Sequence, residues 1–170
     1  FIRDNRLEAE AHMRSNDAVN VLPHDVFAFT MIQEILSRML RIEPGIYRHS
    51  VGSFHIYEQE RDQKKVTQFM SEGCQANIAM PSMPQGDPWP AIKLVLKAEE
   101  RIRRSMPLEV DLSGLDDYWL DLIKLLQVYA LPESANAADF DVSREVVSYS
   151  GYRVFVNKLR DRKLNGGVPM

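Results

Sequence analysis

Three things are scarce in this sequence: cysteine, long apolar runs and an excess of positive charge. The one cysteine, Cys74, cannot form an intrachain disulfide, which favours a reducing compartment, and we expect a cytoplasmic protein. No run approaches the roughly 20 apolar residues that cross a membrane, so we expect no membrane partner. The 21 basic and 24 acidic residues give a net charge of -3, which excludes a global basic field for non-specific nucleic-acid binding. We also expect no bound metal.

The composition is otherwise ordinary for a globular protein, since 45% of the 170 residues are apolar and 26% are charged. Alternating apolar residues predict a strand over 6–14, and β-branched and aromatic residues predict a second strand over 46–58. Between them, apolar residues recur at helical spacing over 26–40. Strands first and helices later indicate the α+β class with a helical C-terminal part. The further helices are expected over 61–72, 91–105, 118–131 and 142–162.

Arg14 and Ser15, at the end of the first expected strand, are the first candidate binding residues. The guanidinium of an arginine offers paired donors to a phosphate, and an adjacent hydroxyl adds one more. The alternative is structural. Arg14 would then pair with a surface carboxylate, while Asn16 and Asp17 would form a turn. Composition alone favours this structural interpretation.

Two further features also have a functional and a structural interpretation. Asp25 lies just before the expected first helix, where an aspartate commonly caps the helix. Alternation along the second strand places Ser53, His55 and Tyr57 on one face. A histidine beside a tyrosine can hold a sugar hydroxyl, but both residues are also common in half-buried positions with local partners.

Together these residues form a more specific pattern than any of them alone. The run RSNDAVNVLPHD, followed by a helix and then GSFHIYEQE, resembles the thymidylate synthase family. The resemblance is strong over 1–58 and fades beyond Gly73. We therefore expect a single domain that is the C-terminal fragment of such an enzyme, family-like and nucleotide-binding over 1–73 and divergent and mostly helical over 74–170. The residues that match in order and spacing are Arg14, Ser15, Asp17, Pro23, Gly52, His55 and Tyr57.

The resemblance implies a role for each of the polar residues. Arg14 and Ser15 would bind the 5′-phosphate of a pyrimidine deoxynucleoside monophosphate. His55 and Tyr57 would hydrogen-bond the 3′-hydroxyl of its sugar. Asp17 would lie beside the base and the folate. The resemblance also implies a homodimer that transfers one carbon from 5,10-methylenetetrahydrofolate to carbon 5 of the pyrimidine.

In that family a cysteine thiolate adds to carbon 6 of the pyrimidine, which makes carbon 5 nucleophilic. The P-C-H motif that carries this cysteine has no counterpart here, and we expect it in a segment that precedes Phe1. Cys74 follows an expected surface helix, with no proline before it and no histidine after it, so we interpret it as a structural thiol. We therefore expect no catalytic residue in this chain, and we expect the fragment alone to be inactive.

Position 25 departs from the family pattern in a way that affects base specificity. Thymidylate synthases have an asparagine there, which recognises the carbonyl oxygen and ring N–H of uracil, whereas this sequence has Asp25. A carboxylate can accept from the exocyclic amine of cytosine, and a protonated one can also donate to the ring nitrogen. The change resembles the deoxycytidylate hydroxymethylase branch of the family. Both dTMP from dUMP and hydroxymethylated dCMP remain possible products, and helix capping remains the structural alternative.

Other departures lie where the family binds folate. Val21 replaces a glycine that lets folate approach the backbone, and Ser53 replaces an aspartate. Gln59 and Glu60 replace a final Asn-His pair. The C-terminal segment that closes over folate in the family has no match. A nucleotide-binding module that has lost catalysis is therefore the alternative to an enzyme, and a full-length sequence without the P-C-H cysteine would favour it.

Overall fold

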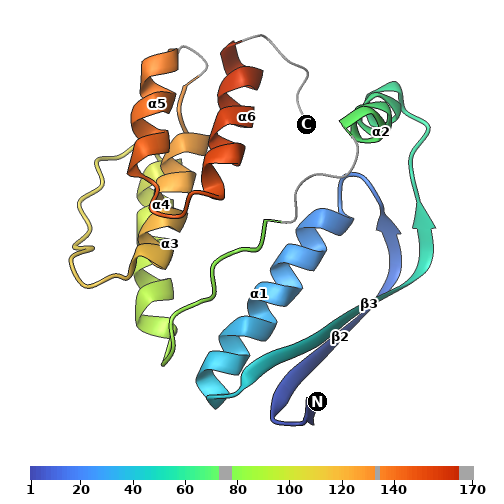
Figure 1. The fold of residues 1–170 in the computed structure, drawn as a ribbon. Helices are drawn as coiled ribbons and strands as arrows, with labels where there is room; N and C mark the ends of the chain where they lie inside the picture. Colours follow the sequence, from blue (N-terminus) through green and yellow to red (C-terminus); the bar gives the residue numbers. More distant parts are fainter. Residues whose placement is uncertain (73–77, 133–134, 165–170) are drawn as a thin grey trace. The chain divides into compact units, whose positions relative to one another are not determined.

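The computed structural model describes residues 1–72, 78–132 and 135–164, and the chain separates into two compact units, Phe1–Asn77 and Ile78–Met170. In the described residues the first unit contains a sheet and two helices, and the second contains helices joined by loops (Figure 1). The α+β class predicted from the sequence is confirmed. That the two units form a single domain stays a prediction.

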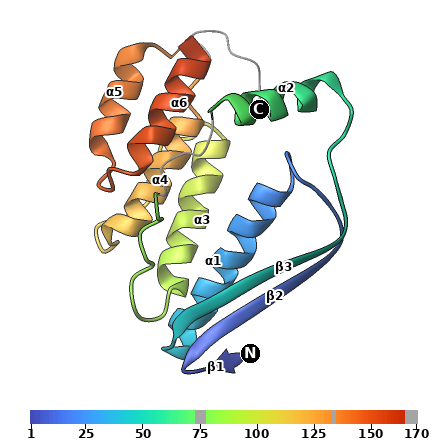
Figure 2. The same ribbon diagram turned by 45° about the vertical axis from the view of Figure 1, so that its right-hand side comes forward.

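The sheet of the first unit has the strand order β1-β2-β3. β1 (Ile2–Arg3) pairs antiparallel with β2 (Arg6–Asp17), and β3 (Glu43–His55) pairs parallel with β2. α1 (Leu22–Leu40) connects the two long strands and packs on them (Figure 2), and α2 (Glu60–Glu72) follows β3. The sequence predicts the two long strands but not β1, because a two-residue strand is too short to show alternation.

A bulge interrupts the parallel pairing near its start. Leu7 pairs with Pro44, but Ala9 pairs with Tyr47, so β3 has one more residue than β2 between these two pairs. Beyond the bulge the pairing continues to the carboxyl ends of both strands, which therefore lie side by side. Two of the pairs at those ends are Ser15 with Ser53 and Asp17 with His55.

α1 begins at Leu22, whereas the sequence predicts a start at residue 26. Pro23 lies in the first turn, where the helix does not need the N–H that proline lacks. The N-cap is Val21, which forms no side-chain cap, and Asp25 lies inside the first turn. The capping interpretation of Asp25 is therefore wrong, and the carboxylate makes a different contact.

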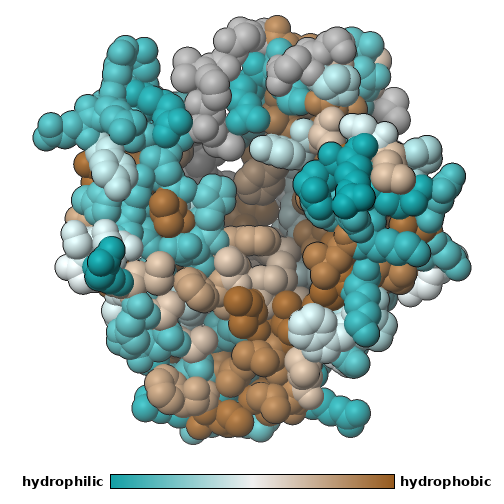
Figure 3. Space-filling model, turned by 180° about the vertical axis from the view of Figure 1, so that it is seen from behind, coloured by the Kyte–Doolittle hydropathy of each residue, from teal (hydrophilic) through white to brown (hydrophobic). Residues whose placement is uncertain are grey.

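α1 buries polar residues rather than its apolar stripe. Its buried residues are Gln33, Ser37 and Arg38, and Gln33 donates from Nε2 to the carbonyl oxygen of Leu7 at 2.6 Å. This amide donates to a strand carbonyl oxygen that would otherwise lie beneath the helix without this hydrogen bond. Apolar side chains are visible at the surface of the molecule (Figure 3), and those of α1 that are exposed are Phe27, Ile32, Leu36, Met39 and Leu40.

In the second unit α3 packs against α4, and α5 packs against α6. α3 spans Trp89–Arg103, α4 spans Asp117–Tyr129, α5 spans Ala137–Val146 and α6 spans Tyr152–Leu164. One core cluster of this unit consists of Val128, Ala135, Phe140 and Val156.

The last helix predicted from the sequence, over 142–162, is instead the end of α5, a break and most of α6. The break has a specific cause in α4. Asp121, only 1% exposed, accepts the backbone N–H groups of Ser148 and Tyr149 at 2.8 Å each. Because these N–H groups donate to a carboxylate, they cannot continue the helix, and the chain turns before α6.

Candidate functional site

The two candidate phosphate-binding residues lie near the carboxyl end of β2. Arg14 and Ser15 are both exposed. Arg14 forms no ion pair with another residue in the described part of the chain, so nothing there supports the surface ion-pair interpretation. The Oγ of Ser15 lies 3.5 Å from Nδ1 of His55. An arginine without a carboxylate partner, next to a hydroxyl group, is chemically suited to an anion.

The candidate sugar-binding residues lie at the carboxyl end of β3, next to this pair. His55 ends the strand and is half-buried, whereas Tyr57 is 52% exposed. Their rings meet edge to face, with centroids 4.8 Å apart and planes at 78°. The parallel pairing aligns Ser53 with Ser15 and His55 with Asp17. Polar groups from two neighbouring strands therefore meet at one edge of the sheet.

Asp17 is buried, and its carboxylate is engaged by the turn that follows β2. Oδ1 accepts the backbone N–H groups of Val19 at 2.8 Å and Asn20 at 3.1 Å, and Oδ2 accepts from Nδ2 of Asn20 at 2.8 Å. Burial would raise the pKa of Asp17, but the hydrogen bonds from Asn20 and Val19 outweigh burial and lower it. An ionised carboxylate therefore orders the turn that leads into α1.

Asn20 connects the same turn to α2. Its Nδ2 also donates to Oδ1 of Asp62 at 3.0 Å, and its Oδ1 accepts from Nζ of Lys65 at 2.7 Å. Asp62 is only 1% exposed. No local pattern in the sequence indicates these contacts, because they join residues 42 and 45 positions apart. Asp17 and Asn20 thus hold the start of α1 and one face of α2 together.

Asp25 belongs to a second polar network, in the first turn of α1. Its Oδ2 accepts from Nδ2 of Asn16 at 2.7 Å, and the same nitrogen lies 3.3 Å from Nε2 of His49. Nδ1 of His49 is 2.6 Å from the hydroxyl of Tyr47. Burial, together with the nearby charge of Asp25, raises the pKa of Tyr47. The sequence analysis missed Asn16, His49 and Tyr47 as members of the site.

The departures from the family pattern have structural counterparts. Val21 is 41% exposed, so its side chain covers backbone that a glycine would leave open. Ser53 is exposed beside Ser15. The carbonyl oxygen of Gln59 accepts the N–H of Asp62, so the chain enters α2 at this point instead of extending the strand.

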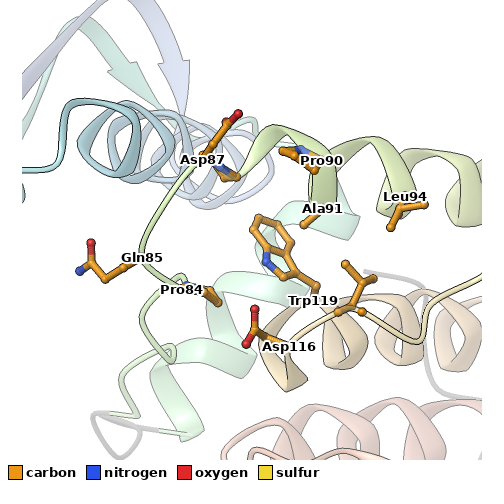
Figure 4. A pocket seen from close by; sticks show the side chains of 11 residues that line it. Pro84, Gln85, Asp87, Pro90, Ala91, Leu94, Asp116 and Trp119 are labelled. Carbon is orange, nitrogen blue, oxygen red and sulfur yellow. The ribbon is translucent and has the colours of Figure 1, made fainter.

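The second unit contains a separate cavity of about 210 Å³. The side chain of Trp119, which is only 5% exposed, lines this cavity, and Asp116 lies beside it (Figure 4). The proline-rich loop before α3 contributes Pro84 and Pro88 to the lining. None of the candidate residues from the sequence lines this cavity, so it forms no part of the site at the sheet edge.

Three further expectations concern membrane spans, metal ligands and Cys74. No described helix is long and apolar enough to cross a membrane. In the described ranges no group of three or more His, Cys, Asp and Glu residues could hold a metal ion. Cys74, interpreted above as a structural thiol, lies outside the described residues.

Comparison with known proteins matches the first half of the chain. The model of the family described as thymidylate synthase matches residues 1–85. A thymidylate synthase of Mycoplasma pneumoniae is 24% identical over 66 residues, which cover 39% of this chain and 23% of the relative. That of Bacillus licheniformis is 31% identical over 62 residues, covering 36% and 22%. That of Bacillus phage phi3T is 27% identical over 66 residues, covering 39% and 24%. The matched segment thus spans less than a quarter of each of these relatives.

Proposed function

Because this chain belongs to the thymidylate synthase family, we propose that the carboxyl ends of β2 and β3 bind a pyrimidine deoxynucleoside monophosphate for one-carbon transfer to carbon 5 of its base. The observation that carries the proposal is the juxtaposition of Ser15 and His55 across the parallel strands, next to an arginine that has no carboxylate partner in the described residues. The match to the family model covers both strands.

The phosphate and the sugar are assigned to different residues. The guanidinium of Arg14 and the hydroxyl of Ser15 bind the 5′-phosphate, since both are exposed and both offer donors. His55 and Tyr57 hydrogen-bond the 3′-hydroxyl of the sugar, and their edge-to-face contact fixes the imidazole relative to the phenol. The 3.5 Å separation of the Ser15 Oγ and His55 Nδ1 supports adjacent phosphate and sugar subsites.

The base is assigned to Asp25 and to the turn held by Asp17. The carboxylate of Asp17 is fully engaged with the turn, so its part is to position backbone beside the base rather than to bind it directly. Asp25 has one oxygen held by Asn16, and its other oxygen has no donor among the described side chains. That oxygen accepts a hydrogen bond from the exocyclic amine of cytosine, whereas the 4-carbonyl of uracil would face it with lone pairs.

Two products follow from the two possible bases. A uracil nucleotide would be methylated to dTMP, and a cytosine nucleotide would be hydroxymethylated. The aspartate at position 25 favours the cytosine substrate, because a buried mismatch of two acceptors is strongly unfavourable. The thiolate that adds to carbon 6 is expected from a P-C-H segment outside these 170 residues, so the chain alone is proposed to be inactive.

The one-carbon donor implied by the family is 5,10-methylenetetrahydrofolate, which supplies the carbon that becomes attached to carbon 5. The described residues do not fit the family's folate surface, because exposed Val21 stands in place of its glycine and Gln59 leads into α2. No step is therefore assigned to residues on that side. A homodimer is also proposed, and light scattering of the complete protein would test it.

The base assignment is tested by nucleotide binding to the complete protein. Calorimetry with dCMP and dUMP should show tighter binding of dCMP, and Asp25→Asn should shift the ratio of the two affinities toward dUMP by about tenfold or more, the effect of one hydrogen bond to a charged group. Asp111→Asn is the matched control, because it makes the same chemical change at an exposed site in the second unit. Equal affinities that Asp25→Asn leaves equal would contradict the base assignment.

The alternative function, a nucleotide-binding module without catalysis, predicts the same binding but no chemistry. Incubation of the complete protein with the folate donor and a nucleotide tritiated at carbon 5 separates the two functions. Release of tritium would identify the enzyme, because carbon 5 loses its hydrogen when the new bond forms. Binding without release would identify the module.

A further inference from the structure

The carboxylate of Asp25 is held from behind by a buried amide. Asn16 is 2% exposed and contacts Asp25 Oδ2 at 2.7 Å. A carboxylate in its ionised form accepts hydrogen bonds and donates none. The atom of Asn16 that faces it is therefore the amide nitrogen Nδ2, which donates to Oδ2.

The same amide nitrogen determines which ring nitrogen of His49 carries the proton. Nδ2 of Asn16 lies 3.3 Å from Nε2 of His49, and an N–H donor requires an acceptor at that distance. Nε2 therefore carries no proton, and the proton of the neutral imidazole is on Nδ1. From there it donates to the hydroxyl oxygen of Tyr47 at 2.6 Å. In this arrangement each contact of the series joins one donor to one acceptor.

The Oδ1 atom of Asn16 has no hydrogen-bond partner within the described residues, although it is buried. A buried acceptor without a donor is unfavourable, and such groups in folded proteins call for an explanation. The amide could turn over to satisfy this oxygen differently, but its carbonyl would then face the Asp25 carboxylate. The observed orientation keeps the contact with Asp25 at the expense of Oδ1, so stability alone does not explain the placement of Asn16.

We propose that Asn16, supported by His49 and Tyr47, is a specificity-determining residue that occupies Oδ2 of Asp25 and leaves only its Oδ1 to meet the base. This inference rests on the proposed function, because it requires Asp25 to contact a pyrimidine. A single ionised oxygen selects a ring with an amine at position 4 over a ring with a carbonyl there. Asn16 itself does not touch the ligand and acts as a positioning residue.

The test measures three ligands on the complete protein: dCMP, dUMP and 2-deoxyribose 5-phosphate, which has the phosphate and the sugar but no base. Asn16→Ala should lower the ratio of dCMP to dUMP affinity by about tenfold, because the carboxylate loses a charge-assisted hydrogen bond. Binding of the sugar phosphate should change less than twofold. A merely structural role for Asn16 would weaken all three ligands together, and that result would overturn the proposal.

A second variant covers the possibility that Asn16→Ala does not fold. Asn16→Leu keeps the size of the side chain but offers no donor to Oδ2 of Asp25. Without that donor the cytosine preference should again fall by about tenfold. Asn136→Ala is the matched control, since it removes an exposed asparagine that caps α5 in the second unit and contacts no candidate site residue, and it should leave the ratio unchanged.

The Asp25→Asn background distinguishes the two proposals. If Asp25→Asn shifts the ratio but neither Asn16 variant does, the base assignment stands and the role of Asn16 is refuted. If no variant shifts the ratio, the base assignment fails, and if no nucleotide binds, the proposed function itself fails. In the double variant with Asp25→Asn, Asn16→Ala should add nothing to the ratio, because the carboxylate that Asn16 holds is already gone.

Discussion

Replacing Asp17 by alanine should destabilise the protein by about 3 kcal/mol, although the residue lies at a candidate binding site. The mutation leaves two backbone N–H groups, of Val19 and Asn20, without their acceptor in a buried turn. Each hydrogen bond to a charged group contributes about 1.5–3 kcal/mol. The third donor, Nδ2 of Asn20, keeps its bond to Asp62, so we do not count it. Urea denaturation of the complete protein, followed by circular dichroism, measures the loss.

Two further variants make this prediction specific. Asp17→Asn retains one acceptor oxygen and should cost about half as much, roughly 1–2 kcal/mol. Asp111→Ala removes an aspartate that accepts a backbone N–H from Ser113 at 3.0 Å in an exposed turn, where water can replace it. That control should cost about 0.5 kcal/mol or less. A loss for Asp17→Ala no larger than for Asp111→Ala would refute the reasoning from burial.

The pH dependence gives an independent check on Asp17. Its pKa is lowered in the folded protein, so its ionised form contributes stability above the ordinary aspartate pKa of about 3.9, and this contribution is lost as the pH falls through the lower folded value. The stability difference between the wild type and Asp17→Ala should therefore be constant above about pH 5 and shrink below about pH 4. A difference that grows with acidification would contradict the assignment of an ionised carboxylate.

The remaining predictions concern the strand edge and the second unit. Arg14→Ala should weaken binding of a nucleoside monophosphate by about tenfold or more while leaving the nucleoside unaffected, as measured by calorimetry; equal losses would remove Arg14 from the phosphate site. Gly52→Ala should destabilise the protein by about 1–3 kcal/mol in urea denaturation, because the added Cβ would lie 3.0 Å from the carbonyl oxygen of Arg14. An unchanged midpoint would show that the two strands move apart enough to accommodate the Cβ. Asp121→Ala should cost about 3 kcal/mol and accelerate amide hydrogen exchange at Ser148 and Tyr149, and unchanged exchange there would show that Asp121 does not hold the break between α5 and α6.

The sequence was sufficient to predict the elements that depend on local pattern. Alternation located β2, and β-branched and aromatic residues located most of β3. The start of α1 was predicted four residues late, because a proline such as Pro23 is compatible with both a loop and the first turn of a helix. The apolar stripe of α1 suggested a buried face, yet Gln33 occupies the interface because strand carbonyls there need a donor.

The candidate site could be predicted only in part, for a similar reason. The nucleotide-binding candidates belong to two short runs, so a pattern of order and spacing identifies them, and their roles stay predictions. The contact between Asn16 and His49 joins residues 33 positions apart and depends on how the strands pair. Asp121 interrupts the last helix from 27 positions away. Periodicity carries no information on contacts of this kind, because they arise only after the chain has folded.

The bulge near the start of the parallel pair determines which side chains meet at its far end. If the same two strands paired regularly from Leu7 and Pro44 onward, with no bulge, every later pair would move by one position. Ser15 would then lie beside Gly52, and the partner of Asp17 would be a phenylalanine in place of a histidine. Regular pairing of this same sequence would thus exchange the two faces of β3 at the strand ends and remove the imidazole from the hydroxyl, without altering a single residue of the site.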